Sequence, residues 1–420
     1  MKVLIFAFVL TYVSVINSFK IKKIEGVEGY VSQVLFDSKF NAFVYAFDTK
    51  DDNLARLYKL DPDNNIIFIR ELINPSCEIF LNNKDELNLI CDTNDGIFTV
   101  EISIIRINSS EIEYITTVDL VSYLEDNNGN LIFHSADVGL LFLKYNTTEA
   151  ALIKNLDNFV WNYDPVATDS NGNTYLAGYS LQNGKNQFVV IPGDSKENTP
   201  EGYILEGFLD HSAYDFIDDL SINSNDELLI SITNYQSRAR IKKLGNGTIT
   251  TIYENEGYDE YYIFPSEKRT LVAAYEYQHY TSRITILGDD GESVEVSNSS
   301  NNETWSFEYR AILIDEEGNA FIEWPSEEEK RSKLEFLNHA EATTVEVDLR
   351  DIKYIDYTVF DGNNNLWIKT YGEVYFVDKD SLKVQVVTYA SDHLEIFGNM
   401  KKKSSEIYMN NGNAFYVIIN

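Results

Sequence analysis

Polar turns recur between apolar runs along the whole chain. Each copy has an apolar run, a turn rich in Asp, Asn and Gly, and a second apolar run. The clearest turns begin at Asp126, Asp169, Asp315 and Asp361. Short apolar runs bounded by turns of this composition indicate β-strands. A repeat of this length, made of strands and turns, is typical of a β-propeller, in which each repeat is one four-stranded blade.

The spacing of the turns predicts the number of blades. The turns recur at intervals of 41 to 54 residues, at Asp37, Asn82, Asp126, Asp169, Asn223, Ser266, Asp315, Asp361 and Lys402. One blade takes about 40–45 residues, and propellers usually have four to eight blades. The sequence therefore predicts an all-β fold, a β-propeller of seven to nine four-stranded blades with eight as the central expectation. Because a propeller grows by adding blades to one body, residues 19–420 are expected to form a single domain.

The two ends of the chain are expected to share one blade. The last full repeat contains four strand-like runs, at Tyr354–Phe360, Asn365–Tyr371, Glu373–Asp378 and Lys383–Thr388. Only three follow it, at His393–Phe397, Glu406–Met409 and Ala414–Ile419. The alternating segment Phe19–Glu25 offers a fourth, outer strand. Such pairing would cover an open sheet edge, and we hypothesise that it closes the ring.

The first residues have the pattern of a secretory signal peptide. Lys2 precedes an apolar stretch from Val3 to Ile16, and the small residue Ser18 follows. This stretch of 14 residues is shorter than the roughly 20 that a membrane-spanning helix needs. We therefore expect residues 1–18 to be removed and the mature chain to be secreted.

Two further features agree with secretion. Five Asn-X-Ser/Thr sequons are expected to carry N-linked glycans, at Asn108, Asn146, Asn246, Asn298 and Asn302. The two cysteines, Cys77 and Cys91, flank the polar turn Asn82–Glu86. In a hairpin centred on that turn they would face each other within reach of a disulfide, which an oxidising compartment favours. Two unrelated buried thiols are the alternative.

Charge narrows the range of partners. The formal net charge is −33 and the pI is near 4.4. A surface this acidic repels nucleic-acid phosphates and anionic membranes, so neither is an expected partner. Solubility is the ordinary explanation of the charge. We expect a monomer whose partner is a small molecule or an extracellular protein.

Few residues have the pattern of a catalytic site. The sequence contains no Gly-x-Ser-x-Gly, His-Glu-x-x-His or Gly-x-x-x-x-Gly-Lys-Ser/Thr motif, and no two of its five histidines have zinc-ligand spacing. The metal candidates are four carboxylates near the starts of repeats, Asp215, Asp219, Glu308 and Asp356. They would have to converge at the mouth of a central channel to hold a divalent cation. As solvated turn residues they would hold none, and no cofactor is otherwise indicated.

The repeated turn itself has two interpretations. Asp169-Ser-Asn-Gly-Asn173 resembles the start of a calcium loop, but such a loop needs Gly at its sixth position and Glu at its twelfth. Those positions are Thr174 and Ser180. Since the turn also recurs in most repeats, we interpret it as a structural Asx turn between the first two strands of each blade.

The same phrases carry a family resemblance. Asp169-Ser-Asn-Gly-Asn-Thr-Tyr-Leu-Ala-Gly and Asp361-Gly-Asn-Asn-Asn-Leu-Trp-Ile-Lys resemble the blade motif of the regucalcin/gluconolactonase propellers. They are also similar to the secreted ommochrome-binding proteins of insects, as is the segment beginning at Glu373. The resemblance implies a propeller. In the lactonase family it would also imply a divalent metal held by Glu, Asn and Asp from different blades, but no residue of this chain matches those positions.

These observations favour a secreted, non-enzymatic binding protein that uses a propeller face to hold a small molecule or an extracellular protein. Whether the chain is an enzyme stays open, and the missing catalytic motifs favour the negative answer. Two alternatives remain. One is a metal-dependent hydrolase of the lactonase type. The other is a secreted interaction protein of the salivary or venom type. A fold alone does not choose among them.

Overall fold

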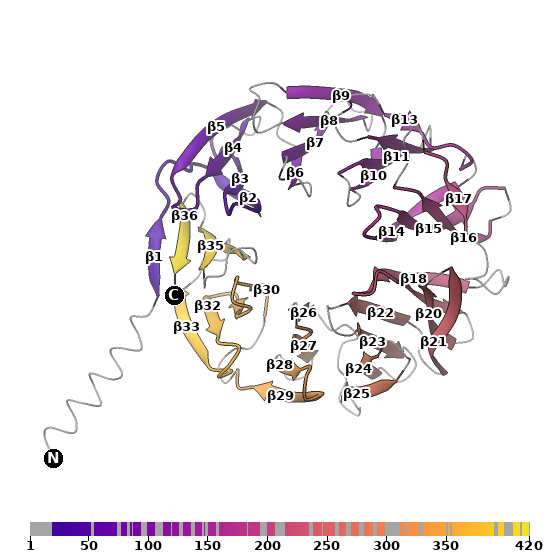
Figure 1. The fold of residues 1–420 in the computed structure, drawn as a ribbon. Coiled ribbons are helices and arrows are strands. Elements are labelled where there is room, and N and C mark those ends of the chain that lie inside the picture. The colour runs from indigo at the N-terminus through magenta and orange to yellow at the C-terminus, as the bar shows by residue number, and fades with distance from the viewer. Residues whose placement is uncertain are drawn as a thin grey trace, which may run out of the picture. The chain divides into compact units, whose positions relative to one another are not determined.

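The computed structural model describes an all-β protein. Between residues 19 and 419 it leaves out 52–53, 74–76, 82–84, 86, 94–98, 106–111, 119, 126–128, 136–138, 145–146, 148–149, 157–158, 183, 194–199, 206–214, 235–237, 246, 257–259, 266–269, 277–280, 289–291, 299–310, 316, 327–330, 350–351, 353–354, 390–393, 399–405 and 412–413. The described residues form 36 strands in nine four-stranded antiparallel sheets (Figure 1). They include no helix, and so none that could cross a membrane.

Each sheet contains four strands, which are named below in the order in which they lie side by side. Four sheets are β2(Tyr30–Phe36) β3(Ala42–Phe47) β4(Leu54–Leu60) β5(Ile66–Ile73); β6(Cys77–Leu81) β7(Leu87–Thr93) β8(Thr99–Ile105) β9(Ile112–Val118); β10(Leu120–Glu125) β11(Leu131–Ser135) β12(Gly139–Leu143) β13(Ala151–Leu152); and β14(Phe159–Thr168) β15(Thr174–Ser180) β16(Asn186–Ile191) β17(Tyr203–Ile204). Four more are β18(Asp215–Ile222) β19(Leu228–Asn234) β20(Arg238–Gly245) β21(Thr248–Glu256); β22(Glu260–Pro265) β23(Thr270–Glu276) β24(Thr281–Leu287) β25(Ser293–Asn298); β26(Ala311–Ile314) β27(Ala320–Ser326) β28(Arg331–Asn338) β29(Thr343–Val347); and β30(Tyr357–Phe360) β31(Leu366–Lys369) β32(Glu373–Val377) β33(Val384–Tyr389). The ninth is β34(Leu394–Gly398) β35(Glu406–Asn411) β36(Ala414–Ile419) β1(Lys20–Lys23).

The chain divides into two compact units. The first contains the described residues up to Leu81 together with those from Val347 onward, and the second is Asn82–Glu346. Each unit has its own buried apolar clusters.

In the first unit, the N-terminal strand completes the C-terminal sheet. Strand β1 pairs antiparallel with β36, from Lys20 opposite Ile419 to Lys23 opposite Tyr416 (Figure 1). Phe19, just before β1, makes edge-on ring contacts with Trp367 and Phe376 of the β30–β33 sheet, at centroid distances of 5.6 and 5.3 Å. The expected pairing of Phe19–Glu25 as the outer strand of the last sheet is therefore confirmed.

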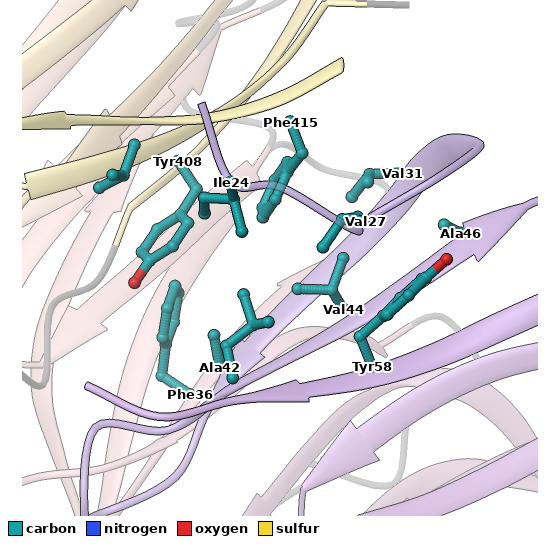
Figure 2. Close-up of a cluster of buried hydrophobic side chains, with 12 residues drawn as sticks. Ile24, Val27, Val31, Phe36, Ala42, Val44, Ala46, Tyr58, Tyr408 and Phe415 are labelled. Carbon is teal, nitrogen blue, oxygen red and sulfur yellow. The ribbon is translucent and has the colours of Figure 1, made fainter. Parts of the chain in front are cut away.

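An apolar cluster joins the sheet that contains both chain ends to the β2–β5 sheet. Figure 2 shows Ile24 and Val27, which follow β1, with side chains of β2, β3 and β4 on one side and of β35 and β36 on the other. Ile24 is 2% exposed, and Tyr408 and Phe415 are 1% exposed. Burying a large apolar side chain contributes about 1.5–3 kcal/mol. The segment after β1 therefore stabilises the contact between the two sheets.

In the second unit, successive sheets pack face to face. Leu176 and Val189 pack in the cluster shared with the β10–β13 sheet, whereas their neighbours Ala177 and Phe188 pack in the cluster shared with the β18–β21 sheet. Adjacent residues of a strand point to opposite faces, so a middle strand with a sheet on either side is apolar throughout. This explains the consecutive apolar residues Tyr175–Ala177 of β15 and Phe188–Ile191 of β16.

The structure confirms the all-β prediction and the four-stranded repeat. Nine sheets lie within the expected range of seven to nine and exceed the central expectation of eight. The strands of the last repeat agree with the expected runs to within three residues at either end. The signal peptide, residues 1–18, lies outside the described residues, and a single domain over residues 19–420 stays a prediction.

Candidate functional site

The repeated turn is a hydrogen-bonded structural unit. In the copy at Asp361, the carboxylate accepts bonds from the backbone amides of Asn363 and Asn365, at 2.9 and 3.1 Å. It also accepts from Asn365 Nδ2 and from Trp367 Nε1, the latter at 2.9 Å. Asp361 and Trp367 are both 0% exposed. The carboxylate is thus surrounded by donors of its own turn, which confirms the Asx interpretation.

The same geometry recurs in other copies. Asp37, Asp169 and Asp315 each accept from the amides two and four residues later, and Asn223 does the same with its side-chain oxygen. Asp61 makes the same two bonds in a different turn, between β4 and β5. The fourth residue of each turn has a positive φ, as at Gly172, Gly318 and Asn364. Glycine and asparagine tolerate this conformation best. The Asp, Asn and Gly of the phrase therefore each have a structural role.

The Asn at the end of the repeated turn accepts a hydrogen bond from a second turn of the same sheet. Asn365 Oδ1 accepts from Lys379 N, and Asn319 Oδ1 accepts from His339 N, both at 3.1 Å. Asn173 Oδ1 makes the equivalent bond to Gly193 N at 3.2 Å. Each turn is thereby fixed to the turn that follows the third strand of the same sheet.

Two of the four carboxylates singled out as metal candidates lie on β18. Asp215 is its first residue and pairs with Asn234 of β19. Asp219 lies beside a register shift, and its Oδ2 accepts from the backbone amide of Ile263 in the next sheet, at 2.6 Å. Its Oδ1 accepts from Leu220 N at 2.8 Å. Asp219 therefore joins two successive sheets.

The other two candidates lie elsewhere. Asp356 is in the first unit, where its carboxylate pairs with Lys369 Nζ at 3.4 Å and its amide donates to the Lys369 carbonyl. Glu308 lies outside the described residues. In the part of the chain that the structure describes, no three His, Cys, Asp or Glu side chains are grouped so that they could hold a metal ion. The assignment of the four carboxylates to a metal site stays a prediction.

Side-chain acceptors on first strands join neighbouring sheets, and the sequence did not reveal them. Gln33 of β2 lies at a register shift like that of Asp219, and its Oε1 accepts from Ile79 N of β6 at 2.8 Å. In both pairs the donor is 44 or 46 residues further along the chain. One repeat length separates acceptor and donor, so the repeat period is the only sequence signal that could have suggested these bonds.

The polar cluster with the most distinctive chemistry lies in the first unit, between β34, β35 and β2. Tyr30 Oη donates to Glu395 Oε1 at 2.5 Å, and Asn410 Nδ2 donates to the Val31 carbonyl at 3.0 Å. Glu395 and Asn410 are directly paired residues of β34 and β35. Asn410 is 0% exposed, whereas Tyr30 and Glu395 are partly exposed. We call Tyr30, Glu395 and Asn410 the acceptor cluster.

The acceptor cluster raises the pKa of its tyrosine. Burial, followed by the hydrogen bond and charge of Glu395, raises the pKa of Tyr30 to about 12. Tyr30 is protonated at neutral pH, as tyrosine ordinarily is, and its hydroxyl donates a hydrogen bond to Glu395 Oε1. The other carboxylate oxygen, Oε2, and Asn410 Oδ1 are buried, and no donor among the described residues reaches either of them.

The modification sites expected from the sequence lie mainly outside the described residues. This holds for Asn108, Asn146, Asn246 and Asn302, while Asn298 ends the outer strand β25. Cys77 begins β6 and Cys91 lies in β7. These two strands are neighbours in one sheet, as expected for the predicted hairpin. The disulfide and the glycans stay predictions.

Comparisons with known proteins support the fold. No protein-family model matches the sequence, and no curated protein matches it either. Among solved structures, dipeptidyl peptidase 4 from Porphyromonas gingivalis matches with a TM-score of 0.54 and 11% identity, over 88% of this chain and 60% of that one. The β-propeller domain of the trilobed protease from Pyrococcus furiosus matches with a TM-score of 0.44 and 10% identity, over 86% and 98% of the two chains. At such identities the likeness is one of fold.

A lactonase-type protein is among the similar solved structures. A putative 6-phosphogluconolactonase from Bacteroides uniformis matches with a TM-score of 0.40 and 11% identity, over 76% of this chain and 93% of that one. No sequence comparison supports the regucalcin/gluconolactonase or ommochrome-binding families.

The comparisons correct the functional expectation. Several similar solved structures are peptidases, including dipeptidyl peptidase 4, an acylaminoacyl peptidase and prolyl endopeptidases. The expectation of a non-enzymatic binding protein, and the inclination against an enzyme, are therefore wrong. The chain spans 52 to 60% of the length of these peptidase chains.

Proposed function

We propose that this chain belongs to a peptide hydrolase, in which its propeller-type fold receives and holds the peptide. The observation that carries the proposal is the structural match to dipeptidyl peptidase 4 over 88% of this chain, at a TM-score of 0.54. Since this chain corresponds to 60% of that protein, the proposal assigns peptide engagement to the described residues and assigns the nucleophile to none of them.

Charge suggests which peptides the hydrolase takes. A net charge of −33 creates a field that concentrates cations near the protein surface. Basic peptides would meet the protein faster than acidic ones, and added salt would reduce the difference because exposed charges are screened over about 10 Å at 0.1 M. The proposed substrates are therefore basic or neutral peptides rather than acidic ones.

The proposal also includes the closed propeller, the secretion and the monomeric state expected for the protein. We propose that the nine sheets are the blades of one propeller closed by β1, secreted after removal of residues 1–18 and active outside the cell as a monomer. Glycans on the five sequons and a Cys77–Cys91 disulfide would suit that compartment. The pairing of β1 with β36 supports the closing strand.

A cleavage assay tests the proposal. The whole protein to which this chain belongs, secreted from eukaryotic cells, is incubated with an equimolar mixture of peptides of one length that differ in net charge, at low and high salt. Mass spectrometry follows the products, and medium from cells without the gene serves as the control. We expect cleavage that favours basic peptides at low salt and loses this preference at high salt. No product above the control would overturn the proposal, while equal cleavage of all peptides would refute only the charge preference.

A further inference from the structure

The acceptor cluster contains two buried oxygens that lack a donor. Glu395 Oε2 and Asn410 Oδ1 are both buried, and no described residue donates to either. A buried acceptor without a donor costs about 1–3 kcal/mol, and more when it is charged. Such atoms in a folded protein need an explanation, such as a ligand, an ion or a water molecule.

The two oxygens belong to side chains that point the same way. Glu395 and Asn410 are directly opposite each other on β34 and β35, where Cβ atoms are about 4.5–5.5 Å apart. Glu395 receives a bond from Tyr30, and Asn410 donates to the carbonyl of Val31, the next residue of β2. Both side chains therefore extend toward the start of β2.

The other polar atom of each side chain already has a hydrogen-bond partner. Glu395 Oε1 accepts a hydrogen bond from Tyr30 Oη, and Asn410 Nδ2 donates one to Val31 O. These two bonds leave Glu395 Oε2 and Asn410 Oδ1 without a donor. The Val31 carbonyl fixes the orientation of the Asn410 amide, because it requires the amide nitrogen on its side. What is missing is a group that only donates and that can bridge two oxygens.

A primary ammonium group has this chemistry. It carries three donors and no acceptor, and it is small enough to bridge neighbouring oxygens. Calcium needs six to eight oxygen ligands, which one carboxylate and one amide do not supply. A positive charge would also neutralise Glu395, which lies directly opposite the fully buried Asn410.

We propose that Glu395 Oε2 and Asn410 Oδ1 bind the ammonium group of a primary amine. The ligand would approach along Glu395 and Tyr30, which are partly exposed, with Asn410 at the closed end. The negative charge of the protein would favour its arrival. This inference does not depend on peptide hydrolysis, because it rests on the bonding of the first unit alone.

The test uses methylammonium chloride as the probe. Thermal unfolding of the full chain is measured against rising concentrations of methylammonium, with tetramethylammonium chloride at equal concentration as the control. Both ions carry one positive charge, but only methylammonium donates hydrogen bonds. We expect a saturating rise in Tm with methylammonium and none with tetramethylammonium.

Three variants locate the effect. Glu395→Gln keeps the oxygen that accepts from Tyr30 and places an amide donor toward Asn410 Oδ1. It should therefore fold without the ligand and bind methylammonium about tenfold more weakly or worse, as expected when a hydrogen bond to a charged group is lost. Tyr30→Phe leaves both free oxygens in place and should still bind. Asp380→Asn makes the same charge change at a side chain that is 82% exposed, and it should respond like the wild type.

Several outcomes would overturn the proposal. Equal responses to the two ammonium ions would show a salt effect. An undiminished response in Glu395→Gln would place binding elsewhere. A crystal structure in methylammonium that shows an ordered water bridging Glu395 Oε2 and Asn410 Oδ1 would assign the missing donor to water.

Discussion

The Asp361 turn offers a quantitative test of how the repeat is stabilised. In Asp361→Ala the Trp367 indole and both the backbone and the side-chain amide of Asn365 lose their acceptor while these two residues remain buried, at 0 and 6% exposure. Each orphaned buried donor costs about 1–3 kcal/mol. Three such donors give an expected loss of about 3–9 kcal/mol for the local opening of the β30–β33 sheet.

The assay must be local because a chain of this size need not unfold in one step. Hydrogen exchange followed by mass spectrometry reports the opening free energy of individual segments. In Asp361→Ala the peptide that covers β31 should exchange about 100-fold faster or more, since each 1.4 kcal/mol is a factor of ten. Peptides of the second unit should exchange at the wild-type rate.

Asp61 is the matched control. It makes the same bonds to Asp63 N, Asn65 N and Asn65 Nδ2, but its turn is exposed. Water can replace the lost acceptor there, so Asp61→Ala should accelerate amide hydrogen exchange much less than Asp361→Ala does. Adding Trp367→Phe to Asp361→Ala removes one of the orphaned donors and should recover part of the loss. Equal effects of Asp61→Ala and Asp361→Ala, or unchanged exchange of β31, would refute the reasoning.

Three other predictions concern the chain ends, a histidine and the cysteines. Deleting Phe19–Glu25 removes β1 and the buried Ile24, so the Tm should fall sharply, and an unchanged Tm would contradict a stabilising role for this strand. Burial lowers the pKa of His134, so its contribution to stability is present above the unfolded value of about 6.5 and is lost as the pH falls toward the folded pKa. The Tm of the wild type should therefore drop more than that of His134→Phe between pH 7.5 and 5.5, and parallel curves would refute this. Thiol titration of the denatured secreted protein should find no free Cys77 or Cys91, whereas two reactive thiols would exclude the disulfide.

The local structure of the repeat could be predicted from the sequence because its causes are local. Asp361 bonds to residues two, four and six positions later, and the positive φ falls on Asn364 within the same phrase. The nine turn anchors also agree with the nine sheets. The lower central expectation of eight came from the usual size of propellers and not from this chain.

The bonds between sheets could not be predicted because their partners are distant in sequence. Asp219 looked like a metal candidate, but its Oδ2 accepts from Ile263 N, 44 residues away. Glu395 is bonded to Tyr30, 365 residues away, and gave no signal in the sequence. A single carboxylate reveals its role only when the register of its strand and the identity of the neighbouring sheet are known.

The function could not be predicted because the repeated phrase is structural. Its Asp, Asn and Gly residues stabilise turns, so the phrase indicates the fold and says nothing about chemistry. The search for catalytic motifs then favoured a protein without enzymatic activity, whereas dipeptidyl peptidase 4, an enzyme, is among the proteins of similar fold.

The most direct test of the proposed function is an unbiased search for cleaved bonds. The whole protein to which this chain belongs is secreted and incubated with a peptide library prepared from a whole proteome, and newly formed amino termini are labelled and identified by mass spectrometry. The proposal predicts a reproducible set of new termini that increases with protein concentration, is rich in basic peptides and is absent from the mock-purified control. A library that contains no new termini beyond that control would contradict the assignment of this chain to a peptide hydrolase.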